Sequence, residues 1–139
     1  MSKKIRWAVL GSGGIAQRRT IPEGIIPAAN AELRSVYDVN TKVNAKVAIK
    51  FGARAANIID ELLTSDIDAV YIATPANFHC QQVIECAKAK KHILCEKPLG
   101  MTIKETQKMI TACKKAKVQL GTAFMMRFHS QHQAALQMI

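Results

Sequence analysis

The sequence is poor in acidic and aromatic residues, and both shortages restrict the partners it could have. Ten Asp and Glu stand against twenty Lys and Arg, which gives a formal charge of +10 and a tendency to attract anions. Aromatic residues make up only 5% of the chain, so few rings lie among the lysines to stack nucleic-acid bases. We interpret the lysines as solvated faces of helices and expect no nucleic-acid partner; binding of nucleic acid through the positive charge is the least favoured alternative.

The chain also has few cysteines and no long apolar run. Its 4 cysteines show neither a C-x-x-C spacing nor a histidine pair at zinc-finger offsets, so we expect no metal site and no disulfide framework. Apolar runs such as residues 7–10 are far shorter than the roughly 20 residues of a membrane span, and the start lacks an apolar signal segment. These features predict a cytoplasmic protein with no membrane partner.

What is present is an alternation of two periodicities over 139 residues, enough for one folded domain. Short apolar runs predict buried strands at 5–10, 33–37, 69–73, 93–95 and 118–124, with a small extra strand at 53–56. Helical spacing predicts helices at 15–26, 42–51, 58–63, 78–89 and 103–116, several opened by the cap-like residues Thr41, Asn77 and Thr102. Glu105 completes a capping box with Thr102.

Repeated strand–helix units imply parallel pairing, because each helix returns the chain to begin the next strand in the same direction. The fold class expected is therefore α/β, a Rossmann-type doubly wound parallel sheet with helices on both faces. The carboxyl ends of its strands meet at one edge, where such sheets bind ligands.

A glycine-rich turn lies between the first expected strand and the first expected helix. Its residues are Gly11, Ser12, Gly13, Gly14, Ile15 and Ala16. Gly11 would allow a tight turn, Gly13 would let the backbone approach a pyrophosphate, and Ala16 would let the helix pack closely on the strand. Free N–H groups at the helix N-terminus would face the phosphates. The alternative is an ordinary glycine-rich turn.

Asp38 ends the second expected strand, where a carboxylate receives the adenosine ribose hydroxyls of a dinucleotide. A carboxylate there favours NAD, because it would repel the 2′-phosphate of NADP. Lys42 could neutralise that phosphate, so NADP stays open as the cofactor. The alternative for Asp38 is a cap of the helix that opens near Thr41.

Polar residues follow the two later strands as well. Thr74, Pro75 and Asn77 would supply a hydroxyl, a fixed φ and an amide beside the nicotinamide, although Asn77 could simply cap the next helix. Glu96 and Lys97 come immediately before Pro98 at the end of an apolar strand. Lys97 could donate a hydrogen bond to a substrate oxygen as hydride leaves the carbon, and its alternative is a solvated loop ion pair with Glu96.

These motifs, with His79 and the late pair Arg127 and Phe128, closely resemble in order and spacing the N-terminal domain of the Gfo/Idh/MocA family, the glucose-fructose oxidoreductase and inositol dehydrogenase relatives. The resemblance implies an NAD(P)-dependent oxidoreductase in which Lys97 assists substrate binding and catalysis. It further implies that the cofactor is contacted, besides the glycine turn, by Asp38, Thr74, Pro75, Asn77, His79, Glu96, Lys97 and Arg127.

Members of that family are more than twice as long, and a second domain carries their substrate pocket and catalytic histidine. By this likeness residues 1–125 form the dinucleotide-binding domain, and 126–139 begin a connecting helix toward a domain that this chain lacks. We expect the intact protein to be a homo-oligomer that transfers hydride between nicotinamide and a hydroxyl-bearing carbon of a sugar, cyclitol or related polyol. The 139-residue chain alone should bind cofactor but turn over little. The alternative is a non-catalytic nucleotide-sensing or regulatory module.

Overall fold

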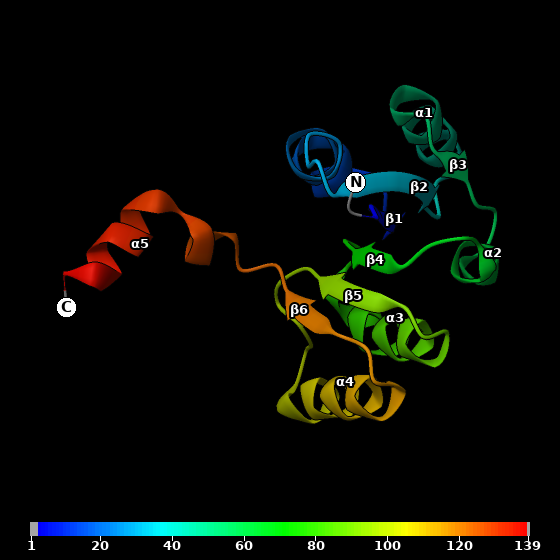
Figure 1. The fold of residues 1–139 in the computed structure, drawn as a ribbon. Helices are drawn as coiled ribbons and strands as arrows, with labels where there is room; N and C mark the ends of the chain where they lie inside the picture. Colours follow the sequence, from blue (N-terminus) through cyan, green and yellow to red (C-terminus); the bar gives the residue numbers. More distant parts are fainter. Residues whose placement is uncertain (1–2, 139) are drawn as a thin grey trace.

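The short apolar runs of the sequence form one parallel sheet. A computed structural model describes residues 3–138, in which six strands pair in the order β3-β2-β1-β4-β5-β6 (Figure 1). The strands are β1 (Ile5–Leu10), β2 (Ala31–Tyr37), β3 (Arg54–Ala55), β4 (Ala69–Ile72), β5 (His92–Cys95) and β6 (Leu120–Thr122). Every pairing is parallel, which confirms the α/β, Rossmann-type fold predicted from the sequence.

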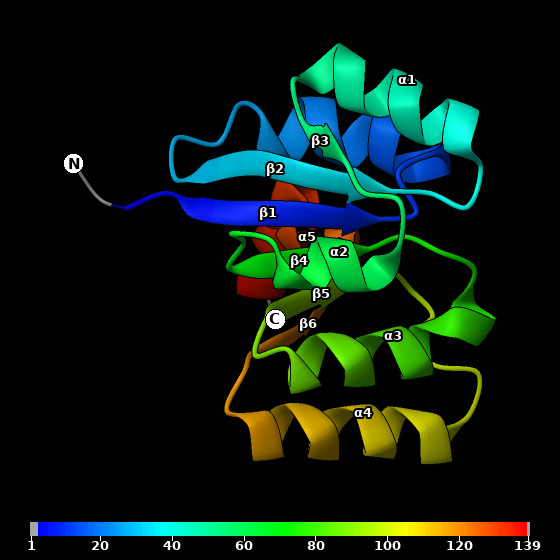
Figure 2. The ribbon, with the colours of Figure 1, turned by 90° about the vertical axis from the view of Figure 1, so that its right-hand side faces the viewer.

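Helices connect the strands and lie on both faces of the sheet (Figure 2). They are η1 (Ala16–Ile25), α1 (Thr41–Phe51), α2 (Ile59–Thr64), α3 (Ala76–Lys88), α4 (Ile103–Ala116), η2 (Met125–Phe128) and α5 (Ser130–Gln137). Helices η1 and α1 pack on one face, and α2, α3 and α4 pack on the other. None of the helices within residues 3–138 combines the length and apolarity that a membrane crossing needs.

Alternation along the central strands builds a separate core under each helical layer. Ala8 and Leu10 of β1 pack with α2, α3 and α4, whereas Val9 between them packs with η1 and α1. Successive side chains of a strand point to opposite faces, so a strand buried on both sides is apolar throughout. On β4 this alternation places Tyr71 on the η1 face, beside Leu94 of β5.

Helix η1 departs from the regular helix expected at 15–26. It is a π-helix, in which the Ile26 N–H donates to the Ile21 oxygen five residues earlier at 3.0 Å. Pro22 lies inside it and has no N–H to donate to Arg18, so the α-helical ladder is interrupted there.

The helix caps correct two details of the sequence reading. Helix α1 is capped by Asn40, whose side-chain oxygen accepts from the Val43 N–H at 3.1 Å, and Thr41 is its first residue. Helix α3 has Pro75 at its N-cap, so the alternative of Asn77 as the cap is wrong. The expected cap at Thr102 is confirmed by its bond from the Glu105 N–H at 3.2 Å.

The last strand is shorter than predicted, and the chain beyond it leaves the sheet. Only Leu120–Thr122 of the expected 118–124 segment pairs with β5. The chain then forms η2 and α5, and α5 lies apart from the sheet in Figure 1. Residues 126–138 are thus largely helical, and their assignment to a connection toward another domain stays a prediction.

Candidate functional site

The segments that follow β2, β1, β4, β5 and β6 lie side by side at one edge of the sheet. Four of them, those after β1, β4, β5 and β6, are each attached to the end of the adjacent strand by a backbone N–H···O bond. The bonds run from Gly11 to Tyr37 (2.8 Å), Ala73 to Leu10 (2.8 Å), Glu96 to Ile72 (2.9 Å) and Ala123 to Cys95 (2.8 Å). The motifs that follow β2, β1, β4 and β5 therefore lie next to one another along the edge that was predicted to hold the site.

The glycine turn after β1 requires glycine for two different reasons. Gly11 has a φ of +79°, and a Cβ there would lie 2.8 Å from backbone atoms of Ala73 and Thr74. The end of β1 therefore packs too closely on the end of β4 for any side chain. Gly14 has a φ of +52° but faces open space, since within residues 3–138 a Cβ there would meet no atom within 4 Å apart from its chain neighbours and its own helix backbone. Its backbone lies open to whatever binds at this edge.

Asp38 joins the end of β2 to the glycine turn. One carboxylate oxygen accepts from the Gly13 N–H at 2.9 Å, and the other accepts from the Asn40 N–H at 2.9 Å. A Cβ at Gly13 would lie 3.2 Å from the first of these oxygens, so Gly13 makes room for the carboxylate. Asp38 is therefore held at the turn, and the alternative that it caps α1 is wrong because Asn40 does so.

The turn carries features that fit an anion. The Ser12 side chain is fully buried, and its hydroxyl has no hydrogen-bond partner within the described chain. A buried polar atom is costly without a partner, so a ligand oxygen at the turn would satisfy it. The helical segment that follows begins at Gly14, and the first N–H groups of a helix have no intrahelical acceptor. These donors suit the pyrophosphate of a dinucleotide.

The segment after β4 is supported by helix α3. His79 is 1% exposed, and its two ring nitrogens lie 2.8 Å from the Thr74 oxygen and 3.0 Å from the Pro98 oxygen. The Thr74 hydroxyl donates to the Gln82 side chain at 2.6 Å. The His79 ring is thus inside the protein, where it ties the segment after β4 to the segment after β5. Asn77, by contrast, is exposed.

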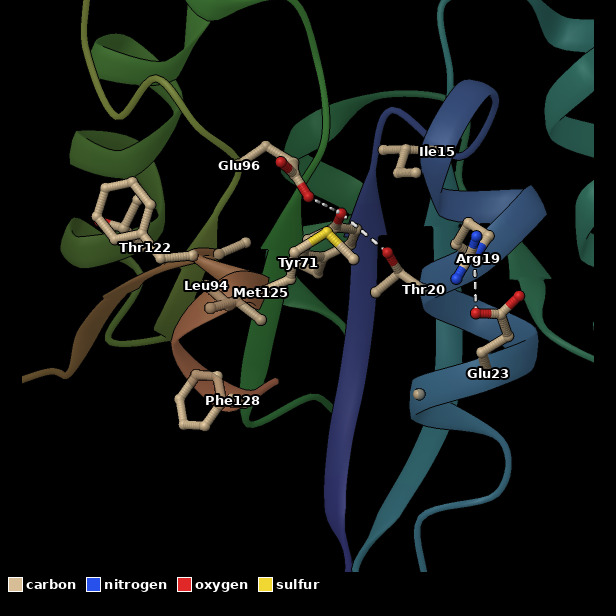
Figure 3. Close-up of a pocket in the computed structure, with 13 residues that line it drawn as sticks. Ile15, Arg19, Thr20, Glu23, Tyr71, Leu94, Glu96, Thr122, Met125 and Phe128 are labelled. Carbon is tan, nitrogen blue, oxygen red and sulfur yellow. Dashed lines mark hydrogen bonds and ion pairs between the residues drawn. The ribbon is translucent and has the colours of Figure 1, made fainter. Parts of the chain in front are cut away.

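Glu96 directly follows β5 and is held by two donors. The Tyr71 hydroxyl donates to one carboxylate oxygen at 2.6 Å, and the Lys97 N–H donates to the other at 3.2 Å. The Thr20 hydroxyl of η1 donates to the Tyr71 oxygen at 3.0 Å. A chain of hydrogen bonds therefore links η1, β4 and β5 beneath the edge (Figure 3).

A cavity of about 320 Å³ opens beside this chain, between η1 and the segment that follows β6 (Figure 3). Its lining includes Ile15, Thr20, Tyr71, Glu96, Met125 and Phe128. Its polar groups are the ion pair of Arg19 with Glu23, the Glu96 carboxylate, and the hydroxyls of Thr20, Tyr71 and Thr122. The rest of the lining is apolar, and such a cavity suits a flat ring that carries a few polar groups. Among the predicted site residues, the structure brings Ile15 and Glu96 to this cavity.

Lys97 and Arg127 lie outside that cavity. Lys97 is exposed, directly after Glu96 and on the same edge as the glycine turn. The peptide bond between Lys97 and Pro98 is cis. Arg127 is also exposed, and its helix η2 contributes Met125 and Phe128 to the cavity. The roles expected for Lys97 and Arg127 stay predictions.

The sequence reasoning missed the three polar residues that support the site from within. Tyr71 donates to Glu96 and accepts from Thr20, and Gln82 accepts from Thr74. A signal existed for Tyr71, because a tyrosine inside a strand buried on both faces needs a partner for its hydroxyl. Its partner is distant in sequence and was not identifiable from spacing.

A parallel sheet with a glycine turn after β1, a carboxylate after β2 and polar groups after β4 and β5 defines a dinucleotide-binding Rossmann domain. A family model described as "Oxidoreductase family, NAD-binding Rossmann fold" matches residues 5–124. The chain belongs to this Gfo/Idh/MocA family of oxidoreductases and contains its NAD-binding domain.

Two curated relatives match most of the chain. The 1,5-anhydro-D-fructose reductase of Ensifer adhaerens is 34% identical over 131 residues, which cover 93% of this chain and 39% of the relative. The myo-inositol 2-dehydrogenase of Thermotoga maritima is 36% identical over 126 residues, 89% of this chain and 37% of the relative. The chain therefore spans about two fifths of the length of these relatives.

A solved structure agrees with the fold. The 3-ketoreductase KijD10 from Actinomadura kijaniata, in complex with NADP, has a TM-score of 0.92 and is 27% identical. The match covers 98% of this chain and 44% of KijD10. That neighbour was crystallised with the phosphorylated cofactor, so the choice between NAD and NADP depends on the residues of this chain.

Proposed function

We propose that this chain is the cofactor-binding part of an enzyme that transfers hydride between a nicotinamide and a hydroxyl-bearing carbon of a sugar, cyclitol or related polyol. The observation that carries the proposal is the convergence of Asp38, the glycine turn, Thr74 and Glu96 on one edge of the sheet. Each group there matches a different part of a dinucleotide. The nicotinamide, when bound, accepts or supplies the hydride.

Three regions of the edge divide the dinucleotide among them. Asp38, next to the turn, would accept hydrogen bonds from the adenosine ribose hydroxyls. The Ser12 hydroxyl and the open backbone at Gly14 would bind the pyrophosphate. Thr74, Pro75 and Asn77 would line the nicotinamide and its ribose, with Ile15 and Glu96 bordering the cavity for the ring.

The position of Asp38 supports NAD as the preferred cofactor. Its carboxylate is fixed by the N–H groups of Gly13 and Asn40, so it cannot turn away from a 2′-phosphate without losing both bonds. Like charges held close together repel each other. Lys42 lies on the exposed first turn of α1, where its charge would offset part of this repulsion. NADP would therefore bind, but more weakly than NAD.

Lys97 is the residue that we assign to the substrate. Its ammonium is exposed on the cofactor edge and follows Glu96 directly. From there it could donate a hydrogen bond to the substrate oxygen and stabilise negative charge on it during hydride transfer. The proton acceptor would come from the part of the relatives that this chain does not span.

The relatives support a polyhydroxylated substrate, since they are named as a reductase of an anhydro sugar and a dehydrogenase of an inositol. Homo-oligomerisation of the whole enzyme belongs to the same proposal. All four cysteines are free thiols, which agrees with a cytoplasmic location.

Calorimetry with NADH and NADPH tests the cofactor site, and the glycines offer a matched pair of variants. Gly14 and Gly52 both have positive φ and both face open space, but only Gly14 lies in the turn. Gly14→Asp should weaken NADH binding by about tenfold or more, because its carboxylate would face the pyrophosphate. Gly52→Asp should bind as the unmodified chain does. If the unmodified chain binds neither NADH nor NADPH, the proposal is wrong.

A further inference from the structure

One buried hydroxyl connects three elements of the fold just below the proposed site. Tyr71 on β4 is 1% exposed, and its hydroxyl lies 2.6 Å from a Glu96 oxygen and 3.0 Å from the Thr20 oxygen (Figure 3). Thr20 belongs to η1, and Glu96 follows β5. A single atom of Tyr71 therefore fixes the carboxylate relative to the helix that begins at the glycine turn.

The directions of these hydrogen bonds follow from the chemistry of the groups. An ionised carboxylate only accepts, so the Tyr71 hydroxyl donates its proton to Glu96 and accepts from Thr20. Burial and the neighbouring Glu96 raise the pKa of Tyr71 well above its ordinary value of 10.0. The hydroxyl therefore keeps its proton and remains a donor at neutral pH.

The carboxylate that Tyr71 holds would otherwise be free to turn. Glu96 is half-buried at the end of a strand, and its remaining bond comes from the N–H of the adjacent Lys97 at 3.2 Å. A glutamate side chain loses considerable rotamer freedom when it is fixed. The bond from Tyr71 selects the rotamer that keeps Glu96 in the lining of the cavity.

Packing alone gives no reason for the hydroxyl. The ring of Tyr71 fills the core between β4 and η1, and a phenylalanine ring would fill nearly the same space. Burial of a hydroxyl is unfavourable unless it is hydrogen-bonded, so tyrosine gains over phenylalanine only through its partners. The more strongly interacting of those partners is the charged Glu96.

We propose that Tyr71 is a positioning residue that holds Glu96 at the mouth of the cavity for the nicotinamide end of the cofactor. This inference rests on the proposed function, because it assigns Glu96 to that part of the cofactor. The adenosine and pyrophosphate regions of the edge do not depend on it, since Asp38 and the turn are held by bonds of their own.

A double-mutant cycle on cofactor affinity tests the proposal. The variants are Tyr71→Phe, Glu96→Ala and the pair together, and the ligands are NADH and ADP, which lacks the nicotinamide half. Tyr71→Phe should raise the Kd of NADH by about tenfold and change that of ADP by less than about twofold. In the Glu96→Ala background the same change should have almost no effect, because residues that act through one another are not additive.

Tyr37→Phe is the matched control, since the structure gives the Tyr37 hydroxyl no hydrogen bond within residues 3–138. Thr20→Val is a second variant in case Tyr71→Phe does not fold. It should weaken NADH binding by about threefold, again only when Glu96 is present.

The outcomes distinguish a failure of the proposed function from a failure of the positioning role of Tyr71. If the unmodified chain binds neither ligand, the proposed function fails before any variant is made, and the positioning role fails with it. If the chain binds NADH but Tyr71→Phe weakens NADH and ADP equally, the tyrosine acts on the fold as a whole and the inference is overturned. An undiminished effect of Tyr71→Phe in Glu96→Ala also overturns it.

Discussion

Removal of one charge at Asp38 should change the cofactor preference of the chain. The carboxylate is half-buried and accepts the N–H groups of Gly13 and Asn40, both at 2.9 Å. Asp38→Asn keeps the shape of the side chain and one acceptor oxygen but removes the negative charge. We expect weaker binding of NADH, because the ribose hydroxyls lose a charged acceptor, and stronger binding of NADPH.

The size of the change follows from the charges involved. A 2′-phosphate carries about −1.5 to −2 charges near pH 7. At a separation of about 4 Å, each unit of charge on it is repelled by Asp38 with about 1 kcal/mol in a water-like medium. The repulsion is therefore about 1.5–2 kcal/mol, or about ten- to thirtyfold in affinity. Because Asp38 is half-buried and not surrounded by water, this water-like value is the lower limit of the repulsion.

The assay is calorimetric titration of NADH and NADPH into the unmodified chain, Asp38→Asn and the control Asp60→Asn. Asp60 is an exposed carboxylate on α2. Asp60→Asn therefore has the same net charge as Asp38→Asn but leaves the site intact. The preference for NADH over NADPH should fall by at least about tenfold in Asp38→Asn only, and by less as salt is added. An unchanged ratio of the two affinities would refute the placement of Asp38 at the adenosine ribose.

Three further predictions concern stability and reactivity. Gly11→Ala should lower the free energy of unfolding by about 2–4 kcal/mol in urea, because its φ is +79° and its methyl would meet backbone atoms at 2.8 Å; a cost equal to that of Gly14→Ala, about 1 kcal/mol, would contradict this. Three donors of Arg6 at 2.7–2.9 Å hold the pKa of Asp68 well below its ordinary value of 3.8. The free energy of unfolding of the unmodified chain should therefore exceed that of Asp68→Asn by about 1–3 kcal/mol above about pH 4, and this difference should decrease as the pH falls further. A difference that does not depend on pH would count against the ion pair. Burial raises the pKa of the Cys86 and Cys95 thiols to about 12, so iodoacetamide should modify them only after unfolding, and mass spectrometry that finds them alkylated in the native chain would disprove their burial.

The arrangement of the edge could be predicted because it depends on few properties of the sequence. Alternating strands and helices require parallel pairing, and parallel pairing brings the ends of β1, β2, β4 and β5 to one edge. Gly11 and Asp38 could then be placed from their position directly after a strand.

Local helix geometry was less predictable, because neighbouring residues competed for the same role. Asp38, Asn40 and Thr41 can all accept an N–H at a helix start, and in the structure Asn40 does so while Asp38 accepts from Gly13. Pro22 lies inside η1, and because a proline in a helix can produce a kink, an end or a π-turn, its position does not specify which of these forms.

The supports of the site depend on contacts between residues far apart in the chain. Tyr71 and Glu96 meet because β4 and β5 pair in register, with Ile72 beside Cys95. His79 was expected at the cofactor, and its buried ring instead contacts the backbone on both sides. Its expected contact with the cofactor stays a prediction, and its visible contacts join the segments that carry Thr74 and Lys97.

A crystal structure of the chain with NADH would show directly which edge of the sheet binds the cofactor. We expect adenosine beside Asp38, the pyrophosphate over the turn at Gly14 and the nicotinamide in the cavity bordered by Ile15 and Glu96. NADH at the opposite edge of the sheet, in the cavity lined by Trp7 and His92, would contradict it.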